Sequence, residues 1–100
     1  MVEKNEEKKM NVVLIHLVNG LILIGALTDS VESIELEDPY MLRINQEGKL
    51  EFIPYMVEFT SDNIFTFNSS VVMNVNKPHE KYALKYEEII KTEAQKQLLS

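Results

Sequence analysis

The stretch that decides the fold is Val12–Asp38, which reads VVLIHLVNGLILIGALTDSVESIELED. Two apolar runs, Val12–Val18 and Leu21–Leu27, flank the dipeptide Asn19-Gly20. Asn-Gly between apolar, β-branched runs is the strongest short-range indication of a β-hairpin, because a type I′ turn needs positive φ at both central residues. The stretch therefore predicts two antiparallel strands joined by a two-residue turn.

The second run contains Gly25, and a third, alternating run follows it. A glycine inside a strand adds no side chain to the packing, and it usually marks a bend or a close backbone approach. In the third run the apolar residues Val31, Ile34 and Leu36 are separated by acidic residues. A bent meander of this kind is how a small sheet curls into a barrel.

Both faces of the first predicted strand are apolar. Val13, Ile15 and Leu17 point one way, and the other face carries Val12, Leu14, His16 and Val18. A strand that is apolar on both faces is covered on both sides. We expect a helix, or another subunit, to cover the second face.

The rest of the chain divides into further strands and one helix. Asp38-Pro39 can bulge the third strand, which resumes at residues 40–44, and extended patterns follow at 50–59, 64–67 and 71–75. Helical periodicity runs from Pro78 to about Leu98, with Asn76 or its neighbour as the expected cap. We expect a single, mostly β domain over residues 1–100: a charged N-terminal arm (1–11), a barrel (12–76) and a C-terminal α-helix (77–98).

Composition limits the possible functions. The 100 residues include no cysteine, and the net charge is −6. Residues 12–75 hold two basic and nine acidic side chains, a net charge of −7, whereas a protein that binds the nucleic-acid backbone should carry a basic patch. The apolar run at residues 12–27 is too short to span a membrane. We expect a soluble, cytoplasmic protein that has no contact with membranes.

Few residues suggest chemistry. His16 is expected to pack in the fold or at an interface, and His79 to be solvated. Glu35, Glu37 and Asp38 could bind a divalent cation, but strand alternation separates Asp38 from the other two, which favours a solvated acidic face. Tyr82 and Tyr86 fit either a partner-binding stripe or a helix packed on its own barrel. With no nucleophile–base arrangement or phosphate loop, we expect no catalytic residues, no metal and no cofactor, and hence no enzyme.

Two motifs resemble those of the Sm-like (LSm) family. LVNGLILIGALTDSVESIEL is similar to the first motif, with Leu17, Gly20, Gly25, Leu27 and Asp29 in the family's positions, and with Ser33 where the family has Asn. FNSSVVMNV is similar to the second, with Asn68 in place of the usual Arg or Lys, and Phe67, Ser69 and Val72 around it. The wider pattern is most similar to Sm-like proteins of large tailed phages, which have a proline in the fourth strand and a trailing helix.

The resemblance implies a strongly bent, five-stranded, SH3-like open barrel that forms homo-oligomeric rings through its fourth and fifth strands. It also implies binding of single-stranded RNA, in the host cytoplasm if a phage encodes the protein. By motif position, the RNA-binding candidates are Asp29, Val31, Ser33, Asn68 and Ser69. The alternative is a ring or adaptor that binds other proteins and no RNA, because the amide at Ser33, the cation at Asn68 and an aromatic at Val31 are all missing.

Overall fold

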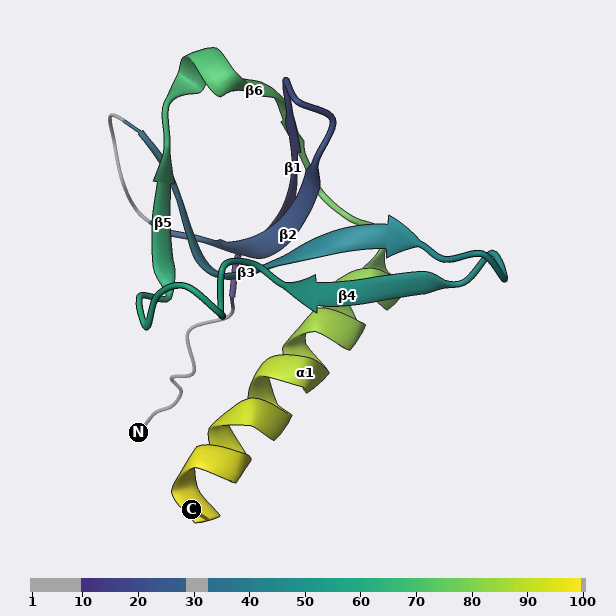
Figure 1. Cartoon of the computed structure of the whole chain (residues 1–100), viewed down its shortest axis with the longest axis vertical. Coiled ribbons are helices and arrows are strands. Elements are labelled where there is room, and N and C mark those ends of the chain that lie inside the picture. Colours follow the sequence, from purple (N-terminus) through teal and green to yellow (C-terminus); the bar gives the residue numbers. More distant parts are fainter. Residues whose placement is uncertain (1–9, 29–32, 100) are drawn as a thin grey trace, which may run out of the picture.

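The computed structural model describes residues 10–28 and 33–99, the part of the chain to which all structural statements below refer. It consists of six strands, a short 3₁₀-helix (η2) and one α-helix (Figure 1). In chain order these are β1 (Val12–Leu17), β2 (Ile22–Leu27), β3 (Ile34–Ile44), β4 (Leu50–Pro54), β5 (Ile64–Phe67), η2 (Ser69–Val71), β6 (Val72–Asn76) and α1 (Glu80–Leu99). The expectation of a mostly β chain with a C-terminal helix is confirmed.

The strands form one antiparallel sheet in the order β4-β3-β2-β1-β6, with β5 paired to β3. The long strand β3 carries two partners on one edge: Tyr40–Ile44 pair with β4, and Ile34–Glu37 pair with β5. The sheet curls, and the β3–β4 hairpin projects from the curl (Figure 1). The sheet is not closed into a barrel. In the described chain β5 pairs with β3 and β6 pairs with β1, but β5 and β6 do not pair with each other.

The expectation of one extended segment over residues 50–59 is wrong. β4 ends at Pro54, which has no N–H to donate to a ladder. Met56 then has a φ of 63°, and its carbonyl accepts hydrogen bonds from the N–H groups of Phe59 and Thr60. The chain therefore turns over residues 55–63, and β4 and β5 both pair with β3. The sheet has six strands, where the resemblance implies five.

The first hairpin has a different turn from the predicted one. Of the two expected turn residues only Gly20 has a positive φ, of 95°. Its N–H donates to the carbonyl of Leu17 at 2.9 Å, and the N–H of Leu17 bonds the carbonyl of Leu21 at 2.9 Å. The loop thus has three residues, Val18–Gly20, with a glycine in the left-handed region at its end. The Asn19 side chain accepts from the Leu21 N–H instead of taking a left-handed backbone.

Gly25 lies at the bend that the sequence predicts. The β2–β3 register shifts between Ile24 and Ala26. A β-carbon on Gly25 would stand 3.3 Å from both the Cβ of Leu36 and the Cα of Pro39. β3 is irregular at the same point, where Asp38 has a φ of 52°. The missing side chain is what lets the two strands approach at the bend.

Two apolar clusters lie on opposite faces of the sheet. Inside the curl, the buried residues are Val13, Ile15, Leu17, Leu23, Leu36 and Phe67. On the outer face, Val12 and Ile24 pack with Tyr86 of α1, with Tyr82, Ala83 and Ile90 beside them. Both faces of β1 are therefore covered as expected, and it is the helix that covers the second one.

The helix begins two residues later than expected, at Glu80. β6 continues to Asn76, which pairs with Leu14, so Asn76 belongs to the sheet and does not cap the helix. The carbonyl of His79 instead accepts from the N–H groups of Tyr82 and Ala83. Figure 1 shows α1 beneath the β3–β4 hairpin, with its C-terminal turns extending beyond the sheet.

Candidate functional site: two sheet edges and the β3–β5 end

Three of the five RNA-binding candidates lie within the described residues; Asp29 and Val31 lie outside them. Ser33 precedes β3, and Asn68 follows β5. The register pairs Ile34 with Phe67, so Ser33 and Asn68 occupy the same end of the β3–β5 pair. The fold thus brings together the two motif segments that the sequence separates by 35 positions.

Asn68 and Ser69 form the turn between β5 and β6. The side-chain oxygen of Asn68 caps η2 by accepting from the N–H of Ser70 at 2.9 Å, and the N–H of Val71 bonds the carbonyl of Asn68 at 3.0 Å. Ser69 begins η2 and is exposed. Asn68 therefore has a structural role as a turn residue, and its side-chain oxygen is engaged in that role.

The acidic residues of β3 were considered above as ligands of a divalent cation. Glu35 accepts a hydrogen bond from the hydroxyl of Thr28 at 2.8 Å. Within the described residues, no group of three or more His, Cys, Asp or Glu side chains is arranged to hold a metal ion. His16 is half-buried on β1 opposite Ile22, and the ring of His79 lies 6.1 Å from that of Tyr82.

Among the described residues no strand pairs with the outer side of β6, which is an open edge, and the hydrogen-bonding pattern shows which groups face it. The N–H of Val18 donates to the carbonyl of Val71 at 2.9 Å. The register shifts between His16 and Leu17, but the N–H of Leu17 bonds Leu21 on the β2 side of β1. By alternation His16 and Leu14 therefore face β6, where they pair with Asn74 and Asn76. The N–H and C=O of Val75 consequently point away from β1, towards the open edge.

β5 presents a second open edge. The N–H of Asp38 donates to the carbonyl of Asn63 at 2.7 Å, in the same register as the Leu36–Phe65 and Ile34–Phe67 pairs. By alternation, Thr66 therefore directs its N–H and C=O away from β3.

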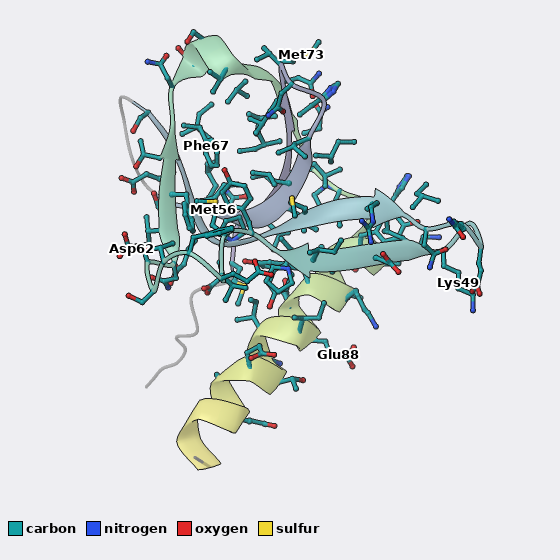
Figure 2. All side chains as sticks on the ribbon, viewed as in Figure 1. Lys49, Met56, Asp62, Phe67, Met73 and Glu88 are labelled. Atoms are coloured by element: carbon teal, nitrogen blue, oxygen red, sulfur yellow. The ribbon has the colours of Figure 1, made fainter. Side chains whose placement is uncertain are left out.

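Apolar side chains accompany both open edges. Ile64 on β5 is 48% exposed, and Met73 and Val75 on β6 are 59% and 39% exposed. Figure 2 shows Phe67 inside the curl and Met73 at its rim. Neither edge strand contains a charged residue or a proline, which are the usual devices that prevent an edge from pairing with another chain.

Tyr86 joins the helix to the bend in the sheet. Its side chain is fully buried, and its hydroxyl lies 2.9 Å from the backbone carbonyls of both Glu37 and Asp38, to which it donates. Those carbonyls lie at the irregular point of β3, where regular pairing with β2 is interrupted. The sequence left both a partner-binding stripe and a packed helix open for Tyr86, and the structure shows the packed helix. Nothing in the sequence indicated this hydrogen bond.

Burial also affects the titration of this hydroxyl. Loss of solvent raises the pKa of Tyr86 well above its ordinary value, and the negative charge of Asp38 raises it further. The pKa of Tyr40, whose ring lies 6.1 Å from that of Tyr86, is also raised, first by burial and then by Glu93 and Asp38. Both phenols stay protonated throughout the neutral range, so Tyr86 remains a hydrogen-bond donor.

No protein-family model matches the sequence, and no curated protein matches it significantly. Among the described segments, no helix has the length and apolar character needed to cross a membrane. Any functional assignment therefore rests on the two open edges, the shared end of β3 and β5, and the motif resemblance.

Proposed function

We propose that this chain is a non-enzymatic, Sm-like assembly protein whose copies join β5 of one subunit to β6 of the next. The observation that carries the proposal is the pair of uncharged strand edges with exposed apolar side chains. Strand addition at such edges supplies main-chain hydrogen bonds, and side chains on the two faces give it specificity. Because the two edges are different surfaces, repeated head-to-tail pairing closes into a ring when the rotation allows it.

We further propose that the ring binds single-stranded RNA at the end of the subunit that carries Ser33 and Asn68. The motif resemblance supports this, as does the register that puts both residues at one end of β3 and β5. The net charge of −7 over residues 12–75 opposes tight binding to phosphates. Binding should therefore be weak and should depend on contacts to bases.

A protein-interaction ring that binds no RNA is the second candidate. It is supported by the acidic balance of the barrel and by the turn role of Asn68, whose side-chain oxygen already bonds the N–H of Ser70. RNA titration separates the two candidates, because they share the same assembly and differ only in the ligand.

The assembly is tested by light scattering on the full chain and on two proline variants. Val75→Pro removes an N–H that faces the open edge, whereas Asn74→Pro removes one that bonds β1. A proline is tolerated at an edge when its missing N–H points outwards, and it disrupts a ladder when the N–H points inwards.

We expect the wild type to scatter as a multiple of the 11.6 kDa subunit, and Val75→Pro to be a folded species of lower mass. Asn74→Pro should lose stability as well as assembly. A wild-type mass of one subunit at micromolar concentration would exclude the ring, and an unchanged mass for Val75→Pro would exclude β6 as the joining edge.

A further inference from the structure

A groove of about 830 Å³ lies on the helix side of the molecule, where three segments meet. Its walls come from the bend of β3, from the loop over residues 55–63 and from the C-terminal half of α1. The apolar part of the lining includes Tyr40, Tyr55, Phe59, Phe65 and Ile90. This volume is within the range of pockets that hold small molecules or a few residues of a peptide.

The groove is distinct from the surfaces described above. It lies at the end of β5 where Asn63 meets Asp38, and the RNA-binding candidates lie at the opposite end, where Phe67 meets Ile34. Its lining includes neither Thr66 nor any residue of β6. A partner could therefore occupy the groove without using the open edges.

The loop places large apolar side chains in solvent beside this groove. Phe59 is 79% exposed and Val57 is 62% exposed, and both line it. The adjacent Met56 is 38% exposed, and Figure 2 shows it where the loop leaves β4. Several exposed apolar side chains gathered beside a groove are typical of an interaction site.

The charged residues of the lining are all acidic. Asp38 comes from β3, Asp62 from the loop and Glu93 from α1, and no lysine or arginine is found among the described residues that line the groove. Figure 2 shows Asp62 at the outer end of the loop. The raised pKa of Tyr40 has Glu93 and Asp38 among its causes, so these two carboxylates act on one ring from different elements. The groove is therefore negative as well as aromatic.

We propose that this groove binds a peptide segment of a partner protein in which lysine or arginine residues alternate with apolar side chains. The apolar side chains would fill the space between the aromatic rings, and the cations would lie near the three carboxylates. Electrostatic complementarity favours this chemistry over an acidic or neutral segment. Cations are also attracted to the faces of tyrosine and phenylalanine rings. The same carboxylates repel the phosphates of a nucleic acid.

The test uses three labelled octapeptides, with lysine, glutamine or glutamate alternating with leucine, and fluorescence anisotropy with the full chain. We expect the lysine–leucine peptide to bind most tightly, with an affinity that falls as salt rises. Asp62→Asn should weaken binding about two- to fivefold, the range of exposed ion pairs. Phe59→Ala should weaken it roughly tenfold if this ring anchors the peptide.

Two matched variants control for total charge and total apolar surface. Glu47→Gln removes an exposed carboxylate at the tip of the β3–β4 hairpin, and Val18→Ala trims a 58% exposed side chain in the first hairpin loop. Neither should change the affinity.

Equal binding of the lysine and glutamate peptides, or no binding at all, would overturn the proposal. So would a loss of affinity in Glu47→Gln as large as that in Asp62→Asn. If Phe59→Ala lowers the mass of the assembly in light scattering, the groove is filled by a neighbouring copy and not by a partner protein.

Discussion

Replacing Tyr86 by phenylalanine tests whether the helix is fixed to the sheet through one hydroxyl group. The substitution keeps the ring, which is fully buried against Val12 and Ile24, and removes the hydroxyl that donates to the carbonyls of Glu37 and Asp38. No cavity larger than an oxygen atom is created. Any change in stability therefore reports the hydrogen bond.

The expected cost is about 2 kcal/mol. A carbonyl left without its partner in the interior costs roughly 1–3 kcal/mol, and here two carbonyls share the lost donor. Single domains of this size have a free energy of unfolding of about 5–15 kcal/mol, so the loss is a substantial part of the total. With a urea dependence near 2 kcal/mol per molar, the midpoint should fall by about 1 M.

The pH dependence gives a second readout. The pKa of Tyr86 is raised in the folded state, so above the ordinary tyrosine pKa of about 10 the unfolded chain loses a proton that the folded chain keeps. The contribution of Tyr86 to the free energy of unfolding is therefore complete below pH 10. Above pH 10 this contribution falls by up to about 1.4 kcal/mol per pH unit. The stability of Tyr86→Phe should fall less steeply over the same pH range. In this variant Tyr40 is the only one of the two tyrosines with a raised pKa that is left to titrate.

The assay is urea unfolding followed by circular dichroism, at pH 7 and at several values above 10. Each series is run at two protein concentrations, because assembly would add a concentration-dependent contribution to stability. Tyr82→Phe is the control, since that ring also packs on the outer cluster. Equal midpoints for wild type and Tyr86→Phe, or equal slopes above pH 10, would refute the role assigned to this hydroxyl.

Two further substitutions test the bend and the RNA-binding candidates. Gly25→Val should destabilise the fold by about 3 kcal/mol or more, because the valine side chain would meet Leu36 and the backbone of Pro39. Gly48→Ala should cost only about 1 kcal/mol, because Gly48 lies in a turn with a φ of 81° and has open space around it. Similar thermal midpoints for the two would show that the bend tolerates a side chain. Asn68→Arg should tighten binding to a uridine-rich oligomer by about 1–3 kcal/mol, and log affinity of the wild type should fall only slowly with log salt. A steep salt dependence in the wild type would reveal a basic surface, and an absence of binding by both proteins would favour the protein-interaction ring.

Local sequence patterns predicted most of the strands, turns and the helix, because these elements depend on residues that are close together in the sequence. Alternation and turn chemistry located the hairpin at Asn19-Gly20 and the bend at Gly25, and the helical period located α1 to within two residues of its start. The two-faced β1 also predicted that something must cover the outer face. Local patterns could not separate residues 50–59 into a strand and a loop, since Met56 takes a left-handed backbone that its side chain does not favour.

Only the tertiary structure decided the features that depend on contacts between residues far apart in the sequence. The hydroxyl of Tyr86 meets carbonyls 48 and 49 positions earlier in the chain, and it does so only because β3 is irregular at Asp38 where the helix crosses it. The β3–β5 register brings Ser33 to the same end as Asn68, and the division of one sheet edge between β4 and β5 creates the acidic, aromatic groove. Sequence periodicity specifies which face of a helix or strand is apolar. Which element packs against that face depends on strand register and on how all the elements pack together.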